Sequence, residues 1–226
     1  MTADDRRAVH HLSSIVHRPF CGTILAMFTV EPLTLTGRAV RLEPLAHAHI
    51  PDLAIAGADA SIWQYMPYPP ATTELAMRGW VEEILSRQAR GTDLVFAVIH
   101  LASGRAIGST RYMDIQPRNR GLEIGGTWYA VAHQRTAVNT ECKYLLLRHA
   151  FEVYDCIRVQ IKTDLRNQRS QRAIERLGAA REGVLRHQVI MPDGYFRSSV
   201  YYSILAEEWA GVKAKLEEKL SVISDQ

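Results

Sequence analysis

The chain has 226 residues, of which 47% are hydrophobic and 23% are charged, a composition typical of a globular domain with a substantial core. Its 27 basic and 24 acidic residues leave a net charge of only +3, which does not favour a nucleic-acid-binding surface. No run of about 18 apolar residues occurs, so the sequence predicts no membrane span.

The cysteines and histidines form no metal-binding pattern. Cys21, Cys142 and Cys156 are odd in number and unrelated in spacing, which argues against a disulfide framework and against a cysteine-rich zinc site. HExxH and paired CxxC motifs are absent, so we expect no metal and interpret the histidines as surface residues. A reducing cytoplasm fits this cysteine usage best.

Residues 1–26 fit neither helical nor strand periodicity. His17, Arg18 and Pro19 interrupt the apolar stretch, which argues against a signal peptide. Strand-like alternation begins after Met27. We expect either a natural start at Met27 or a loosely held extension over 1–26, followed by a single domain over 27–226.

The first part of this domain mixes strand and helix patterns. Period-two alternation predicts a strand over residues 38–45. Helical spacing follows over 47–59 and, more strongly, over 72–91, where a threonine provides the N-cap and a glycine follows the end. The segment between the two helices is aromatic and proline-rich, which resists regular structure.

From residue 93 onward, the pattern predicts a hairpin, a strand–helix–strand crossover and a second hairpin. The expected strands cover 93–100, 106–116, 121–130, 156–164, 183–191 and 197–205, and the expected helices cover 139–153, 170–178 and 207–220. Ser170 is the expected N-cap of the middle helix, and Gly178 ends it. Hairpins followed by one crossover exclude a doubly wound sheet, so the predicted fold class is α+β or mixed α/β.

The segment TWYAVAHQRTAVNTECKYLL, residues 127–146, has the pattern of a strand, a polar loop and the first turns of a helix. The backbone N–H groups and the positive dipole end of such a helix attract an anion. The loop has no glycine, so the alternative is the start of an ordinary core helix. We favour anion binding.

Several segments resemble the GCN5-related N-acetyltransferases (GNAT). They are LEIGGTWY, AHQRTAVNTECKYLLLRHAFE, RVQIKTDLRNQRSQRAIERLGAAREGVLR and DGYFRSSVYYSILAEEW, all within residues 33–220. The resemblance implies a central, mostly antiparallel twisted sheet with a splayed strand pair and flanking helices, and acetyl-CoA as the acetyl donor. The most similar branch contains the acetyltransferases of ribosomal-protein N-termini (RimJ/RimL-like).

The resemblance assigns the pyrophosphate of acetyl-CoA to the loop with the family pattern Gln/Arg-x-x-Gly-x-Gly/Ala. Ala137 and Asn139 replace the two glycines. Alanine keeps a small side chain where backbone approaches phosphate, and asparagine tolerates positive φ. The predicted pyrophosphate-binding residues are Gln134, Arg135, Thr136, Ala137, Val138, Asn139 and Thr140.

The family's splayed strand bonds the pantetheine arm through its backbone, which here implies Thr127, Trp128 and Tyr129. Trp128 is expected to pack its side chain in the core. The alternative for Gly125 and Gly126 is an ordinary bulge in the strand.

The next helix supplies the remaining cofactor contacts that the resemblance implies. Asn167 bonds the pantetheine and the Ser170 hydroxyl lies near the thioester sulfur, although both residues also fit a turn and an N-cap. The family's acidic tyrosine is replaced by Ile174, so Ser170 or an ordered water must protonate the thiolate. Arg135 and Arg172 are candidates for phosphate contact, with a solvated helix face as the alternative.

A general base is needed because an amine nucleophile is mostly protonated at neutral pH. Glu123 is the carboxylate on the cofactor strand and is our first candidate. Its alternative is a solvated strand residue. His187, on a strand near the expected acceptor side, is the second candidate.

We therefore expect an acetyl-CoA-dependent N-acetyltransferase that moves the acetyl group to a primary amine by direct attack in a ternary complex. Cys142 and Cys156 offer no Cys–His pair for a covalent route. The alternative is a non-catalytic acyl-CoA-binding or regulatory module with the same fold.

The acceptor is either a protein N-terminus or a small amine. The loops at 58–72 and 186–198 determine it, and Trp63, Tyr65 and Tyr68 either pack a lid or form the acceptor wall. We expect no nucleic-acid or membrane partner, and the sequence is compatible with a homodimer.

Overall fold

The computed structural model describes residues 28–223, so the expectations for residues 1–26 and for a start at Met27 fall outside the described part. Within it, eight strands form one sheet in the order β1-β2-β3-β4-β5-β6-β8-β7. The strands are β1 (Leu35–Thr36), β2 (Val40–Pro44), β3 (Asp93–His100), β4 (Arg105–Gln116), β5 (Gly121–Tyr129), β6 (Arg158–Asp164), β7 (Ala180–Ile190) and β8 (Phe196–Leu205). The α-helices are α1 (Ile50–Ala56), α2 (Glu74–Ala89), α3 (Ala137–Glu152), α4 (Gln168–Glu175) and α5 (Ala206–Ile223).

The sheet is mostly antiparallel, and only β5 and β6 pair in parallel. Helix α3 connects these two strands as a crossover, while β3 with β4 and β7 with β8 form hairpins. The predicted mixed α/β fold with flanking helices is confirmed.

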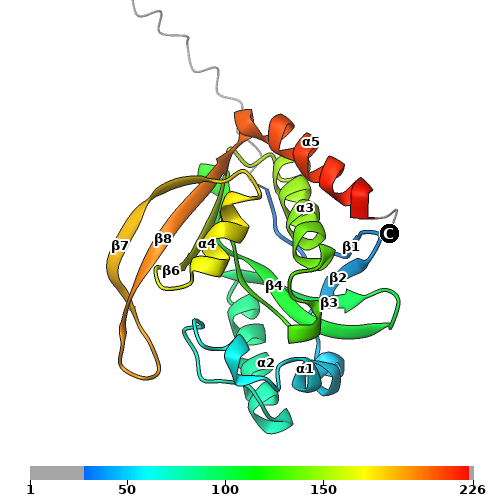
Figure 1. Ribbon diagram of the computed structural model, residues 1–226, viewed down its shortest axis with the longest axis vertical. Helices are drawn as coiled ribbons and strands as arrows, with labels where there is room; N and C mark the ends of the chain where they lie inside the picture. Colours follow the sequence, from blue (N-terminus) through cyan, green and yellow to red (C-terminus); the bar gives the residue numbers. More distant parts are fainter. Residues whose placement is uncertain (1–27, 224–226) are drawn as a thin grey trace, which may run out of the picture.

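The sheet separates two hydrophobic clusters because successive side chains of a strand point to opposite faces. In β3, Leu94 and Phe96 join the cluster that includes α3 and α5, whereas Val95 and Ala97 join the cluster that includes α1 and α2. Figure 1 shows the two helix pairs apart from each other, with strands β2 to β4 between them.

The strands β5 and β6 separate part of the way along their length. They pair only over Gly121–Glu123 and Arg158–Gln160, although β5 continues to Tyr129 and β6 to Asp164. We call the point of separation, after Glu123, the fork. The expected splay is therefore present, and it leaves the β6 side of the second half of β5 without a strand partner.

A bulge in β5 lies just beyond the fork, on the side of β4. Ser109 faces Trp128 and Arg111 faces Gly125, so Gly126 and Thr127 together oppose one residue of β4. Gly126 has φ +57°, which favours glycine. The bulge that was the alternative for this glycine pair is thus present on the β4 side and the expected splay on the β6 side, while the pantetheine contact stays a prediction.

Two helix starts differ from the sequence prediction. Helix α3 begins at Ala137 rather than at residue 139, with Thr136 as its N-cap. Helix α4 begins at Gln168, and its N-cap is Asn167 rather than Ser170, because the Asn167 side chain accepts a hydrogen bond from the Ser170 N–H. Asparagine is as good a cap as serine, and sequence alone does not rank them.

Candidate active site

A cleft of about 320 Å³ opens at the fork. Its walls come from the second half of β5, from β6, from the first turns of α3 and α4, and from the 57–73 loop that joins α1 to α2. We call the part beside α3 and α4 the cofactor half. The part beside Glu123 and the 57–73 loop is the acceptor half.

The first turn of α3 faces the cofactor half. Thr136, Asn139 and Thr140 line it, together with Gln134 and Arg135 of the preceding loop. The first N–H groups of a helix have no acceptor within the helix, so they attract an anion. One of these N–H groups, that of Val138, donates a hydrogen bond to Thr136 Oγ1 at 3.3 Å.

Ala137 and Val138 do not line this cleft, unlike the other predicted loop residues. Val138 is buried in the core. The residue with left-handed backbone is Arg135, with φ 63°, and not Asn139, which lies inside the helix. The tolerance of asparagine for positive φ is therefore not used at Asn139, because α3 starts earlier than predicted.

Gln134 ties the loop to both neighbouring elements. Its Nε2 donates to the carbonyl oxygen of Tyr129 at 3.0 Å, and its Oε1 accepts from Arg169 Nη1 at 2.8 Å. The end of β5, the loop and the start of α4 are thus held together where a diphosphate is expected.

Cationic side chains surround the cofactor half. They are Arg135, Lys143, Arg169 and Arg176. Arg172, a candidate from the sequence, is exposed and does not line the cleft. Arg169 and Arg176 lie seven positions apart and so share one face of the helix, and Arg172 is turned away from that face.

Lys143 is a buried cation that the sequence pattern does not predict. Only 5% of it is exposed, and its Nζ donates to Thr127 Oγ1 at 2.6 Å, which fixes that side chain of β5. Burial lowers the pKa of Lys143 from about 10.5 to about 8. Its position in the helix sequence gives no sign of this burial.

Glu123 lies at the fork, where it lines the cleft with only 1% of its surface exposed. It is therefore buried rather than a solvated strand residue. Gln160 Nε2 and Lys162 Nζ both donate to its Oε2, each at 2.8 Å. Oε1 makes no hydrogen bond within the described residues, which leaves one carboxylate oxygen for a ligand.

His187 is not close to this carboxylate. It is exposed on β7, outside the cleft lining, with its ring 5.6 Å from that of Phe196 and its backbone at φ 50°. The strand that carries it is the last one of the sheet, beyond β8. The structure therefore separates the two candidate bases.

Helix α4 places its predicted residues beside the fork. Asn167, Ser170 and Ile174 all line the cleft. The Asn167 Oδ1 is occupied by the Ser170 N–H at 3.0 Å, so its amide NH₂ group is the part that can serve a ligand. Ile174 is buried and, as expected, offers no acid.

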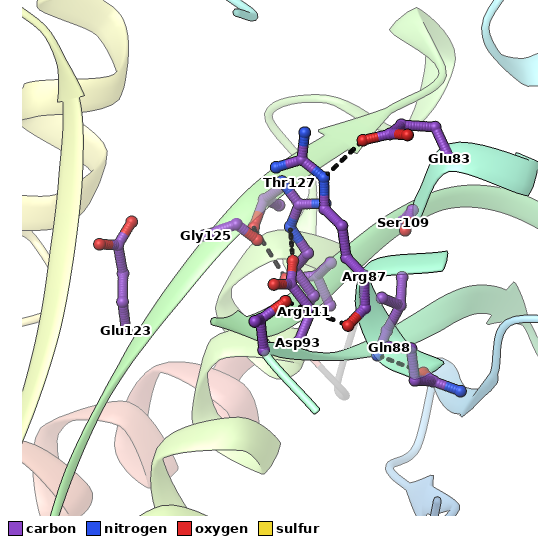
Figure 2. A network of polar contacts seen from close by, with 12 residues as sticks. Glu83, Arg87, Gln88, Asp93, Ser109, Arg111, Glu123, Gly125 and Thr127 are labelled. Atoms are coloured by element: carbon purple, nitrogen blue, oxygen red, sulfur yellow. Dashed lines mark hydrogen bonds and ion pairs between the residues drawn. The ribbon is translucent and has the colours of Figure 1, made fainter. Parts of the chain in front are cut away.

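The backbone at the bulge is closely approached by two side chains. A Cβ on Gly125 would lie 2.6 Å from Met113 Sδ, and a Cβ on Gly126 would lie 2.5 Å from Arg111 Nε. Arg111 is buried and pairs with Asp93 at 3.2 Å, whereas Glu123 extends from β5 apart from this pair (Figure 2). A side chain at either position would therefore displace one of these neighbours, and at Gly126 it would also be strained by the positive φ.

The aromatic residues of the 57–73 loop lie in two places, and their roles as lid or acceptor wall stay predictions. Trp63 is buried and packs on Trp128 at a centroid distance of 5.0 Å, so the expectation that Trp128 packs in the core is confirmed. Tyr65 and Tyr68 line the cleft.

The two cysteines of the described residues are buried, and neither is a reactive thiol. Burial raises the pKa of Cys142 and of Cys156 to about 12, which disfavours the nucleophilic thiolate. Among residues 28–223, no three His, Cys, Asp or Glu side chains are grouped for metal binding. None of the described helices is long and apolar enough to cross a membrane.

Comparison with known proteins identifies the family. Residues 39–180 match the acetyltransferase (GNAT) domain. YdaF of Bacillus subtilis (strain 168), named provisionally as a ribosomal N-acetyltransferase, is 32% identical over 113 residues, which are 50% of this chain and 61% of that protein. The matched part thus spans less than two thirds of YdaF.

Solved structures show the same fold. A provisionally named acetyltransferase from T. thermophilus is 43% identical, with a TM-score of 0.77 over 85% of this chain and 100% of that one. RimL, a ribosomal L7/L12 alpha-N-protein acetyltransferase, is 19% identical with a TM-score of 0.67 over 77% of this chain and 94% of that one, a likeness of fold alone. The resemblance seen in the sequence is confirmed, and the chain belongs to the GNAT acetyltransferase domain family.

Proposed function

We propose that the chain transfers an acetyl group from acetyl-CoA to a primary amine by direct attack in a ternary complex. The observation that carries this proposal is the buried Glu123 at the fork, in a cleft that also receives the first turn of α3. A base and an anion-binding helix end face the same space.

The residues of the cofactor half fit acetyl-CoA. Its phosphates would meet the first turn of α3 and the side chains of Arg135, Arg169 and Arg176. Its pantetheine arm would lie along the part of β5 that has no strand partner on its β6 side, near Asn167. Acetyl-CoA supplies an acyl group activated as a thioester.

The two halves of the cleft would together supply the proton transfers. The amine nitrogen attacks the thioester carbonyl carbon, a C–N bond forms and the C–S bond breaks. Oε1 of Glu123 takes the amine proton, directly or through a water. The Ser170 hydroxyl, or a water held by it, returns a proton to the departing sulfur.

A protein N-terminus is the acceptor class that the names of YdaF and RimL support, and small amines stay open as alternatives. A ribosomal acceptor would place the enzyme in the cytoplasm. Tyr65 and Tyr68 would form the wall against which this acceptor packs.

Initial rates of CoA release over an amine panel test the proposal. The panel contains peptides with a free N-terminus, polyamines, aminoglycosides and free amino acids, and the concentration of each substrate is varied. Intersecting double-reciprocal lines are expected for direct transfer, and parallel lines would contradict it. Tight acetyl-CoA binding without CoA release for any amine would favour the non-catalytic module instead.

A further inference from the structure

Arg197, the second residue of β8, is a buried cation that lines the cleft. Only 7% of it is exposed. Its Nε donates to Ser199 Oγ and its Nη1 donates to the carbonyl oxygen of Tyr65, both at 3.1 Å. Both acceptors are neutral, and no carboxylate lies within ion-pair distance of this guanidinium among residues 28–223.

The other cations of the acceptor half each have a carboxylate of their own. The pairs are Arg111 with Asp93 at 3.2 Å and Lys162 with Glu123 at 2.8 Å. Asp164 and Glu123 act on Arg197 through their charge, but Asp164 is bonded to Arg166 at 2.7 Å and Glu123 to Lys162. A buried charge without a direct partner is costly unless a ligand supplies one.

The Nη2 group of the Arg197 guanidinium can donate hydrogen bonds to such a ligand. Its Nη2 makes no hydrogen bond within the described residues, yet this atom is not sealed from the cleft as Arg111 Nη1 is. The planar guanidinium matches the geometry of a carboxylate, and its two existing bonds fix its orientation.

Glu123 and Arg197 line the same cleft, and the negative charge of Glu123 interacts electrostatically with the Arg197 guanidinium. An acceptor amine that gives its proton to Glu123 therefore has its neighbouring groups near Arg197. On the basis of the proposed function, we propose that Arg197 binds a carboxylate of the acceptor, so that the preferred acceptor is a primary amine with a carboxylate a few bonds from its nitrogen. A peptide that begins with Asp or Glu, and a free amino acid, both have this chemistry.

The test compares acceptors that differ only in this charge. Two peptides of otherwise identical sequence begin with Asp and with Asn, and kcat/KM is measured for each. We expect a preference of roughly 10- to 100-fold for the Asp-first peptide, the range for a hydrogen bond to a charged group. Free aspartate, assayed beside them, distinguishes a free amino acid from a peptide as the source of the carboxylate.

Variants assign the preference to this side chain. Arg197→Gln should bring the ratio of the two kcat/KM values close to one, chiefly through a higher KM for the Asp-first peptide, and Arg197→Lys should restore part of it. Arg118→Gln is the matched control, because Arg118 is exposed between β4 and β5 and does not line the cleft. The ratio should be unchanged in that control.

A measurement on the unaltered protein covers the case in which the Arg197 variants do not fold. Succinate should inhibit competitively against the peptide acceptor, and succinamide should not. Equal kcat/KM for the two peptides, or equal inhibition by the two compounds, would overturn the carboxylate site while leaving acetyl transfer intact. Absence of transfer to every amine would overturn the proposed function itself.

Discussion

The Lys162 ammonium lies 2.8 Å from Oε2 of Glu123, just beyond the last paired residues of β5 and β6. Gln160 donates to the same oxygen. The two donors fix the carboxylate and leave Oε1 without a hydrogen bond among the described residues, so the fork is both a break in the sheet and the position of the buried carboxylate that we propose as the base.

Glu123→Gln tests the proposed base, since glutamine keeps the shape of the glutamate side chain and its amide oxygen can still accept a hydrogen bond from Lys162. We expect turnover to fall by roughly 10²-fold or more, the range for loss of a general base, while acetyl-CoA affinity is retained. The loss should shrink at high pH, where free amine is abundant. Pre-steady-state or steady-state rates across pH check this.

Glu43→Gln is the control for that variant, because Glu43 lies on β2 in an ion pair with Arg41, outside the cleft lining. It should have the rate of the unaltered protein. An unchanged rate in Glu123→Gln at pH 7 would leave His187 or solvent as the base.

The cationic wall of the cofactor half predicts a clear difference between neighbouring arginines. Arg176→Gln should weaken acetyl-CoA binding by roughly 3- to 30-fold, the effect of one charge-assisted contact that is partly exposed, whereas Arg172→Gln should have no effect. Calorimetric titration at several salt concentrations measures both. Because salt screens exposed charges, the dependence of acetyl-CoA affinity on salt concentration should also be weaker in Arg176→Gln. Equal weakening in the two variants would contradict the orientation of α4.

Lys143 predicts a pH dependence of stability. Its folded pKa of about 8 lies below the ordinary value of about 10.5, so the unfolded state binds more protons between these pH values. The free energy of unfolding therefore has its full value, as far as Lys143 is concerned, above pH 10.5. It decreases as pH falls through 8, where the buried amine has to be charged. Such a shift corresponds to roughly 3 kcal/mol.

Lys143→Met should accordingly raise the free energy of unfolding at pH 7, and the gain should shrink toward pH 10. The remaining hydrogen bond of 2.8 Å between Thr110 and Thr127 limits the loss of polar contacts. Denaturant unfolding across pH provides the measurement, with Lys215→Met on the exposed side of α5 as the matched control. A gain that does not depend on pH would refute the buried charge.

Glycine-to-alanine changes at the β5 bulge and in helix α2 should have opposite effects on stability. Gly126→Ala should destabilise by about 1–3 kcal/mol, because alanine is strained at φ +57° and its Cβ would collide with Arg111. Gly79→Ala, in α2 with open space around it, should stabilise by about 1 kcal/mol. Midpoints of denaturant unfolding separate the two. Acetyl-CoA binding should also weaken in Gly126→Ala, since the bulge shapes the cleft wall.

The elements of the fold follow from local sequence because periodicity and caps act over a few residues. The threonine before α2 caps that helix as predicted, whereas α4 ends at Glu175 and so stops before the predicted end at Gly178. The starts of α3 and α4 differ from the prediction because each segment holds two residues of a capping type three positions apart, Thr136 with Asn139 and Asn167 with Ser170.

The candidate site could be predicted only in part. The glycines and Glu123 on β5 stand in a recognisable order, so their place in the cleft was foreseeable. The burial of Lys143 and Arg197, and the choice of Arg176 over Arg172, depend on how distant elements pack together. Such packing leaves no periodic signal in the sequence.

CoA release from acetyl-CoA in the presence of one peptide, with its N-terminus either free or chemically blocked, tests the central claim most directly. Lysine is left out of the peptide so that it contains a single amine. We predict rapid CoA release and an acetylated peptide with the free N-terminus, and only background hydrolysis with the blocked one. Equal release with both peptides, or no release with either despite bound acetyl-CoA, would contradict acetyl transfer to an amine at this cleft.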